Sequence, residues 1–324
     1  MKTLKNFLEN VNNKEEQKKR VTEKEINTIL ELISKKTILK NDFKNINLNI
    51  CEKNSKRHLF FYLNNDINKM EDLLKKGLDP NSIDFNFNVK YLQESKNPFK
   101  ILKLLHSYGM DISWKSSIMY YISKNFILRN KKDEEDLTNI QIYLLNNDSD
   151  YIEKHIKNVD KGNINNISND ILVNLTPSAL NYLIKEKKYN LFNHEVDYIG
   201  NKLLFSFVYF SNIYKNNYDN YSLFKELMNI IPDEALNSVN KDGKTVLWFE
   251  LEDINRFRIL VSRGVNIEIK NNEGKNVLEG AIDNDFKSEI SKVFQEVKSL
   301  KENKSLKELF IKENNSTEKI LKRI

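Results

Sequence analysis

The side chains that most often perform catalysis or bind metals are few and scattered in this chain. Its four histidines are at least 39 residues apart from one another: His58, His106, His155 and His194. A zinc site needs Cys or His ligands at short spacing, and no histidine here has such a partner. The single cysteine, Cys51, excludes a disulfide within the chain. The sequence therefore predicts no metal site, with the histidines packed in helices or exposed on them.

Motifs for phosphate binding and covalent catalysis are also missing. The closest pair of glycines is Gly274 and Gly280, so neither the dinucleotide fingerprint nor the Walker loop can be present. There is no G-x-S-x-G elbow. Carboxylate clusters such as Glu134-Glu135-Asp136 are common in a chain this charged. We therefore expect a protein that is not an enzyme and needs no cofactor, although a catalytic site built from distant residues stays open as an alternative.

The informative residues are glycines that follow apolar helical segments. The pattern L-x-x-x-G-x-[DN] occurs three times, around Gly77, Gly109 and Gly264. A glycine can end a helix in the left-handed conformation that satisfies the last carbonyls, and the following Asp or Asn favours a turn. Repeated use of this device predicts stacked helical units rather than one globular core.

The spacing of the glycines supports a repeat. Gly77 and Gly109 are 32 residues apart, and Gly109 and Gly264 are 155 apart, which is five times 31. A second motif, N-x-[DE]-G-K-x-V-L, places Gly243 and Gly274 31 residues apart. We assign a structural role in the repeat turns to these five glycines.

These motifs resemble the ankyrin repeat, a turn followed by two antiparallel helices in about 33 residues. The resemblance is clearest at residues 67–112 and 240–282 and weakest at 113–230. The T-P-L-H start of the family is reduced to Thr245-Val246-Leu247-Trp248 and to Asn276-Val277-Leu278-Glu279, and its histidine network is missing. Thr245 is expected to cap its helix through the hydroxyl. Another solenoid of helical pairs remains the alternative.

The resemblance implies an all-α fold, an ankyrin-like α-solenoid of about six to eight helical pairs with a helical cap at each end. We divide the chain into an N-terminal cap at 1–53, repeats at 54–285 and a C-terminal cap at 286–324. The expected helical pairs are 54–64 with 67–76, 87–96 with 98–108, 114–128 with 133–147, 150–158 with 167–174, 177–188 with 197–211, a helix at 220–230, 245–252 with 253–263, and 276–282 with 284–303, followed by 306–322. The longest apolar run, Leu203–Phe210, predicts a helix that is buried on all sides.

The net charge of +6 is unevenly distributed. Residues 58–286 carry 28 Lys/Arg against 32 Asp/Glu, a net charge of −4, whereas 1–57 and 287–324 carry +6 and +4. A mildly acidic repeat body repels phosphate, so nucleic-acid binding is disfavoured. No apolar run reaches the ~20 residues of a membrane span, and the first residues lack the apolar stretch of a signal peptide. We expect a cytoplasmic monomer that does not enter the membrane.

Two segments are candidates for partner binding. The first is the set of turns before the first helix of each pair, where we select Phe85, Phe87, Trp114, Asp242 and Glu273. Tryptophan is common in binding hot spots, and Trp114 lies beside a turn. Trp248 lies within an expected helix, so we assign it to the core.

The second candidate is the stretch from Tyr209 to Tyr221, which combines tyrosine, asparagine and serine as adaptable binding loops do. Within it we select Tyr209, Tyr214, Tyr218 and Tyr221. The alternative is a connection between helices whose tyrosines lie along those helices.

Three hypotheses for function remain open. The first is a non-enzymatic module that binds another protein, as ankyrin arrays do; repeats this degenerate resemble those of low-GC bacteria. Within it, an immunity protein that neutralises a toxin fits the acidic body, which suits a basic toxin domain. The second is a secreted effector that engages host proteins. The third is an enzyme or a nucleic-acid binder on a helical solenoid.

Overall fold

The computed structural model describes residues 20–21, 26–27, 30–31, 50–55, 57–63, 65–113, 118–148, 172–192, 195, 199–210, 220–281, 287–296 and 298–299. These residues fall into two compact units. Unit 1 comprises Met1–Tyr189 with Lys215–Tyr218, and unit 2 comprises Asn190–Tyr214 with Asp219–Ile324. The described chain is mostly helical, with almost no β-strand, as the sequence predicts.

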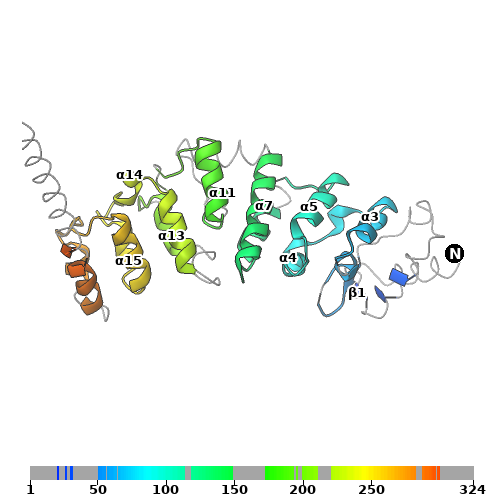
Figure 1. Cartoon of the computed structure of the whole chain (residues 1–324), viewed down its shortest axis with the longest axis horizontal. Helices are drawn as coiled ribbons and strands as arrows, with labels where there is room; N and C mark the ends of the chain where they lie inside the picture. The colour runs from blue at the N-terminus through cyan, green and yellow to red at the C-terminus, as the bar shows by residue number, and fades with distance from the viewer. Residues whose placement is uncertain are drawn as a thin grey trace, which may run out of the picture. The chain divides into compact units, whose positions relative to one another are not determined.

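Unit 1 consists of short helices joined by tight turns (Figure 1). Its elements are β1 (Arg20–Val21), β2 (Cys51–Glu52), η2 (Leu59–Leu63), α3 (Ile67–Lys75), η3 (Pro80–Ser82), α4 (Phe85–Gln93), α5 (Pro98–Ser107), α6 (Ile118–Asn125), α7 (Lys131–Asn147), α11 (Pro177–Asn181) and the π-helical turn η6 (Tyr182–Glu186).

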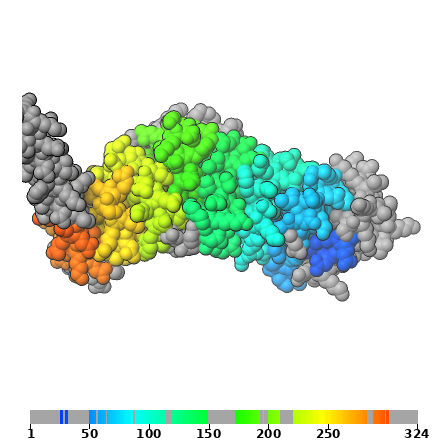
Figure 2. Space-filling view, viewed as in Figure 1, coloured from blue at the N-terminus to red at the C-terminus, as the bar shows by residue number. Residues whose placement is uncertain are grey.

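Alternate helices of unit 1 pack side by side. Helix α4 contacts α6, whereas α5 contacts both α3 and α7, and α7 contacts α11. The helices thus form two layers, which are joined where α4 meets α5 and α6 meets α7. In the space-filling view, the side chains of α3, α5 and α7 close over the gaps between the ribbons (Figure 2). Two layers of paired helices are what stacked helical units require.

Unit 2 has the same alternation. Its elements are α12 (Leu203–Phe210), α13 (Asn220–Ile230), α14 (Asp233–Leu236), η7 (Val246–Phe249), α15 (Ile254–Arg263) and α16 (Val277–Gly280), and residues 287–296 are also helical. Helix α13 packs on α15, and α12 packs on η7. Residues Leu203–Val208 of α12 are all buried, which confirms the predicted burial for this part of the helix.

Three helices end in the same left-handed glycine. Gly77, Gly109 and Gly264 have φ of 102°, 92° and 110°. In each case the next residue donates its N–H, at 3.1 Å, to the carbonyl five residues back: Leu78 to Leu73, Met110 to Leu105, and Val265 to Leu260. This is the Schellman arrangement, in which glycine avoids the steric cost that a β-carbon has at positive φ.

The apolar periodicity of the helices matches their buried faces. In α5, Ile101, Leu102 and Leu105 are fully buried, whereas Leu104 is half-buried. In α15, Phe257 and Leu260 are fully buried. At ~25 cal/mol per Å2 of apolar surface, this burial is the main stabilising contribution to the helical layers.

Two segments that we expected to form α-helices form 3-10 turns instead. The segment at 54–64 begins with a turn, and of its described residues only Leu59–Leu63 are helical, as a 3-10 turn. Before it, Cys51 forms an antiparallel bridge with His58, and β2 pairs in parallel with β1 through Arg20 and Cys51. Within the segment, Leu59 donates its N–H to the carbonyl of Ile50, and the carbonyl of Arg57 accepts the N–H of Glu52, so backbone pairing with the residues just before it replaces helical bonds there.

The segment at 245–252 is likewise reduced to η7, a four-residue 3-10 turn. Thr245 makes no side-chain cap there, so the predicted hydroxyl cap is wrong. The corresponding segment at 276–282 does have a side-chain cap, because Asn276 and Glu279 form a reciprocal capping box at the start of α16. Thr176 caps α11 by accepting the N–H of Ala179 at 3.3 Å.

Several predictions fall outside the described residues: the helices at 150–158 and 306–322 and most of the segment at 167–174. The division into caps at 1–53 and 286–324 and repeats at 54–285 stays a prediction. No helix in the described part of the chain has both the length and the apolar character needed to cross a membrane.

Candidate functional site

Two turns of unit 2 are built from the same hydrogen bonds, 31 residues apart. In the first, Asn240 donates its N–H to the carbonyl of Lys244 at 3.0 Å, and Gly243 donates to the carbonyl of Asn240 at 2.9 Å. In the second, Asn271, Lys275 and Gly274 repeat both bonds at 2.9 Å. The repeat seen in the sequence is therefore a repeat of backbone geometry.

The first asparagine holds each turn through its side chain. Oδ1 of Asn240 accepts the N–H groups of Asp242 and Lys244, both at 3.0 Å. Oδ1 of Asn271 accepts those of Glu273 and Lys275, also at 3.0 Å. An amide side chain that bonds the backbone two residues on is a common way to fix a turn, and it explains the asparagine before each glycine.

The two turns interlock. The N–H of Asn272 donates to the carbonyl of Asp242 at 2.9 Å, and its side-chain amide donates to the carbonyl of Lys241 at 2.7 Å. Lys241 in turn donates its N–H to the carbonyl of Ile199 at 2.9 Å. Three successive turns are thus joined through their backbones, which fixes the spacing of the side chains at their tips.

The third turn contains Gly200, which the sequence reasoning missed. Its φ is 76°, against 76° for Gly243 and 78° for Gly274. In all three turns a helix begins three residues after the glycine, at Leu203, Val246 and Val277. The shared pattern G-x-x-[LV]-L was the signal that could have identified it.

An asparagine bracket joins neighbouring segments in each unit. In unit 1, the side chain of Asn81 donates to the carbonyl of Gly109 at 3.0 Å, and its Oδ1 accepts the N–H of Asp111 at 2.6 Å. In unit 2, Asn237 does the same with Gly264 at 3.4 Å and with Asn266 at 2.7 Å. In each case the asparagine side chain fixes the backbone that follows a Schellman glycine.

The turn residues selected from the sequence have different environments. Asp242 and Glu273 are exposed and lie on the interlocked turns of unit 2, so the structure brings them together. Asp242 pairs with Lys244 at 3.5 Å, and Glu273 pairs with Lys275 at 3.1 Å. These exposed pairs contribute little to stability, so their charges remain usable for recognition.

The expectation that Phe85 projects from a turn is wrong, because its side chain is only 4% exposed. Phe85 is the first residue of α4, and Asp84 caps the helix at the residue before it. The ring of Phe85 therefore packs inward with the helix. Of the other candidates, Tyr221 lies on α13 and is 39% exposed. Phe87 lies in α4 and Tyr209 in α12, but their side chains are not among those that the structure describes. Trp114, Tyr214 and Tyr218 lie outside the described residues.

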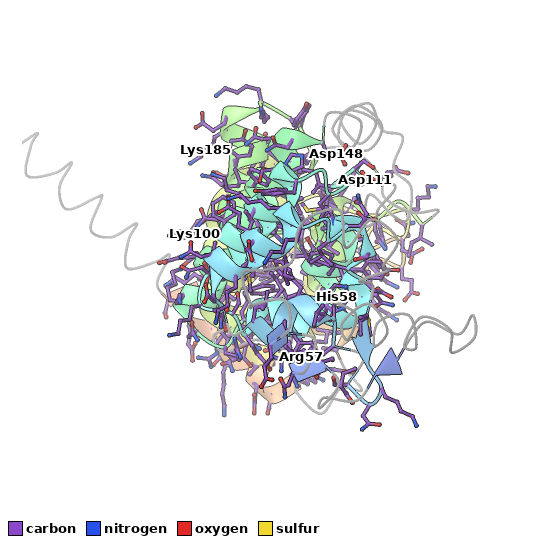
Figure 3. All side chains as sticks on the ribbon, turned by 90° about the vertical axis from the view of Figure 1, so that its right-hand side faces the viewer. Arg57, His58, Lys100, Asp111, Asp148 and Lys185 are labelled. Atoms are coloured by element: carbon purple, nitrogen blue, oxygen red, sulfur yellow. The ribbon has the colours of Figure 1, made fainter. Side chains whose placement is uncertain are left out.

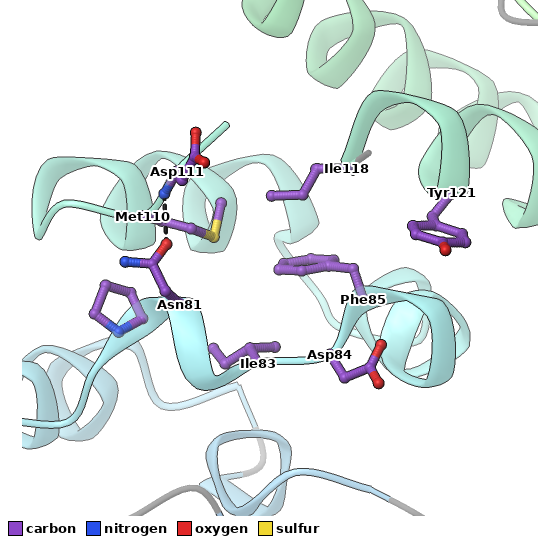
Figure 4. Close-up of a pocket in the computed structure, with 9 residues that line it drawn as sticks. Asn81, Ile83, Asp84, Phe85, Met110, Asp111, Ile118 and Tyr121 are labelled. Atoms are coloured by element: carbon purple, nitrogen blue, oxygen red, sulfur yellow. Dashed lines mark hydrogen bonds between the residues drawn. The ribbon is translucent and has the colours of Figure 1, made fainter. Parts of the chain in front are cut away.

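A cavity of about 290 Å3 lies beside the turns of unit 1 (Figure 4). Its lining comes from the segment between η3 and α4, from the residues after Gly109, and from α6. The lining residues are Pro80, Asn81, Ile83, Asp84, Phe85, Met110, Asp111, Ile118 and Tyr121. In the view of Figure 3, Asp111 lies on one side of the ribbon and Lys100 of α5 on the other, so the cavity and the exposed face of α5 are separate surfaces.

Buried polar groups elsewhere have structural roles. His58 is fully buried, and burial lowers its pKa to about 3. Its Nδ1 accepts the backbone N–H of Phe60 at 3.2 Å, and the backbone N–H of His58 donates to Oδ1 of Asn88 at 3.0 Å. A neutral imidazole is therefore part of the core of unit 1.

The side chain of Gln93 bonds both the N–H and the carbonyl of Ile127. Gln141 does the same for another loop, since it accepts the N–H of Thr176 and donates to the carbonyl of Asn174, both at 2.9 Å. These amides join consecutive segments of unit 1 from within its core and stabilise the loops that they hold.

In unit 2, Nη2 of Arg256 lies 3.2 Å from Oε1 of Glu250, with both side chains buried. The guanidinium also lies over the ring of Phe224, with 4.1 Å between its carbon and the ring centroid. Burial lowers the pKa of Arg256, although the carboxylate of Glu250 opposes that shift. This pair also belongs to the core.

Within the described residues, no three His, Cys, Asp or Glu side chains are placed to hold a metal ion. Cys51 is half-buried in β2, and His106 shares a hydrogen bond of 2.7 Å with the hydroxyl of Tyr143. His155 and His194 lie outside the described residues. No protein-family model matches the chain, and a search of curated proteins finds no relative.

Proposed function

We propose that this protein is a non-enzymatic protein-binding module of the ankyrin-repeat type, which presents a row of turns to one partner protein. The observation that carries the proposal is the interlocking of the turns around Gly200, Gly243 and Gly274 in unit 2. Their tips are held at fixed spacing by backbone hydrogen bonds, while the side chains of Asp242 and Glu273 stay exposed. A rigid surface of this kind loses little conformational entropy when it binds.

The recurring device in both units supports the ankyrin-type architecture. Helix, left-handed glycine, turn and next helix follow one another around Gly77, Gly109 and Gly264, and the helices of each unit lie in two layers. We infer that the same architecture continues through the repeat region at 54–285 as a solenoid. Each helical pair would then cover the apolar face of its neighbour.

The charge of the repeat body favours a basic partner. Residues 58–286 carry a net charge of −4, and the exposed turn side chains include Asp242 and Glu273. Opposite charge speeds association and selects against acidic partners. A more specific form of the proposal is therefore an immunity protein that binds a basic toxin domain and neutralises it.

Affinity capture from the native cell tests the proposal. We expect the tagged full-length chain to recover one protein in constant ratio, with binding that weakens as salt rises. Recovery of nucleic acid alone, or of no protein, contradicts it. A toxin gene directly upstream favours the immunity role, whereas a neighbouring secretion cluster favours an effector that engages host proteins.

Charge reversal of the turns tests which surface binds. We expect Asp242→Lys with Glu273→Lys to weaken binding of the captured partner by about tenfold or more. The matched control is Glu252→Lys with Glu268→Lys, which changes the net charge equally at exposed positions outside these turns. Equal losses in both variants would mean that overall charge, and not the turn surface, governs binding.

The tyrosine segment needs its own variant. We propose that Tyr214 and Tyr218 contact the partner, so replacing both by alanine should weaken binding without lowering the melting temperature. Unchanged binding, or a large loss of stability, would show that these rings serve no recognition role or belong to the core.

A further inference from the structure

The guanidinium of Arg57 lies over two aromatic rings of unit 1 (labelled in Figure 3). Its central carbon is 4.4 Å from the ring centroid of Tyr91 on α4 and 5.1 Å from that of Tyr62 on η2. Both distances are short enough for a favourable cation–π contact. A ring face attracts the charge, but it offers no oxygen acceptor for the N–H groups of the guanidinium.

Those N–H groups have no acceptor in the described part of the chain. Nε of Arg57 is buried there without a hydrogen bond. The two terminal nitrogens also lack a hydrogen bond or ion pair with any described residue, and since they are not buried they are open to solvent. Glu52, the acidic residue of the same loop, accepts the N–H of Ser55 instead, and this bond lowers the pKa of its carboxyl.

The backbone that carries the guanidinium is fixed on both sides. The carbonyl of Arg57 accepts the N–H of Glu52 at 2.9 Å, and its N–H donates to Oγ of Ser55 at 3.2 Å. The next residue, His58, donates its backbone N–H to Oδ1 of Asn88 on α4 at 3.0 Å. The loop and the two rings therefore hold the cation in place before a ligand arrives, so binding orders little.

We propose that Arg57 binds the side-chain carboxylate of one aspartate or glutamate of the partner protein. The two oxygens of a carboxylate match the planar fork of a guanidinium and accept two parallel N–H bonds. A neutral side chain would supply weaker acceptors and leave the charge unpaired.

The charge of the site favours a carboxylate over a phosphate group. A phosphate monoester carries about −1.5 to −2 at pH 7, whereas one guanidinium supplies a single positive charge. The adjoining residues 58–286 carry a net charge of −4, which disfavours a multiply charged anion. This inference rests on the proposed function. It adds one acidic contact to a partner that we expect to be basic, and such a contact fixes the register of binding.

Small probes test the contact without the partner. The probe is N-acetylglutamic acid α-amide, its neutral counterpart is N-acetylglutamine α-amide, and inorganic phosphate is the competing anion. At constant ionic strength, the Nε–H signal of Arg57 in the full-length chain is followed by NMR, since this atom is sealed from solvent. We expect a saturable shift with the carboxylate at a Kd on the order of 100 mM, as for a single ion pair at a surface. The neutral probe should shift the signal at least about fivefold less, and phosphate should bind no more tightly than the carboxylate.

Variants of Arg57 test the contact with the captured partner. Arg57→Lys keeps the charge but loses the planar fork, so we expect binding that is about three- to fivefold weaker. Arg57→Gln also removes the charge and should weaken binding about tenfold. The matched control is Lys53→Gln, which removes an exposed charge from the same loop and should change the Kd by less than about twofold. If Arg57→Gln does not fold, the probe titration of the natural chain decides.

The inference is overturned by no saturable shift with the carboxylate probe, by an equal shift with the neutral probe, or by phosphate binding about tenfold more tightly than the carboxylate. The titration is independent of partner capture, so failure of this contact and failure of the proposed function are distinguishable. A captured partner that binds Arg57→Gln as tightly as the natural chain would also overturn the inference, while the protein-binding role would stand.

Discussion

A β-carbon on Gly243 would lie 2.7 Å from Oδ1 of Asn272 and 2.9 Å from its backbone nitrogen. The glycine is thus required twice, once by its φ of 76° and once by the turn stacked against it. Gly274, in the matching turn, has a φ of 78°, and among the described residues other than its chain neighbours no atom lies within 4 Å of such a β-carbon. The two positions differ in stacking and not in backbone conformation.

This difference predicts unequal costs for alanine. Gly274→Ala should lower the free energy of unfolding by about 1 to 2 kcal/mol, the cost of a left-handed alanine. Gly243→Ala should lose that amount and at least about 1 kcal/mol more, because the backbone of Asn272 must move. Urea denaturation followed by circular dichroism measures both. Equal losses would mean that the turns are not in contact.

The bracket of Asn81 predicts a local effect on exchange. Asn81→Ala removes a donor to Gly109 and the acceptor for the N–H of Asp111, at a cost of about 1 kcal/mol. The amide of Asp111 should then exchange with deuterium several-fold faster in mass spectrometry or NMR. The control is Asn86→Ala, at an exposed position on α4. Unchanged exchange at Asp111 would show that the bracket does not hold the turn.

The buried His58 predicts a loss of stability in acid. Its pKa is about 3 in the folded protein and close to 6.5 when unfolded, so the unfolded chain binds the proton first. Its contribution is therefore complete above pH 6.5 and declines as the pH falls toward 3. At a pH of about 5 the expected loss is roughly 2 kcal/mol.

The matched variant for this prediction is His58→Asn, whose Oδ1 can replace Nδ1 as the acceptor for Phe60. Urea midpoints measured between neutral pH and pH 4 should fall less steeply in the variant than in the natural chain. Parallel slopes would assign the acid sensitivity to other groups.

The pair of Arg256 and Glu250 predicts strong coupling, since their side chains are only 3% and 4% exposed. Glu250→Met leaves a guanidinium buried without its counterion and should cost about 3 to 5 kcal/mol. Adding Arg256→Met should restore stability to within about 1 kcal/mol of the natural chain, because no buried charge remains. Chemical denaturation of the single and double variants provides the double-mutant cycle, and additive losses would contradict the coupling.

The sequence predicted most helices because their signals are local. The ends of α3, α5 and α15 follow from glycines that the chain needs at positive φ, and their buried faces follow from apolar periodicity. The 3-10 turn η7 was not predictable in this way. Its type depends on packing against α12, and α12 is distant in the sequence.

The candidate site was only partly visible in the sequence. Asp242 and Glu273 were found because their turns share a motif at fixed spacing. The cavity in unit 1 was not found, and Phe85 was assigned to the surface although its buried ring lines that cavity. Position in a turn does not say which way a ring points, since that depends on neighbouring segments such as α6.

The sequence by itself determined the repeating device of helix, left-handed glycine and polar turn, because each part is set by the conformational preferences of a few adjacent residues. The tertiary structure alone decided which turns interlock, which carboxylates share a cavity and which buried charges are paired. Those relationships join residues tens of positions apart, and their energy exists only once the chain has brought them into contact.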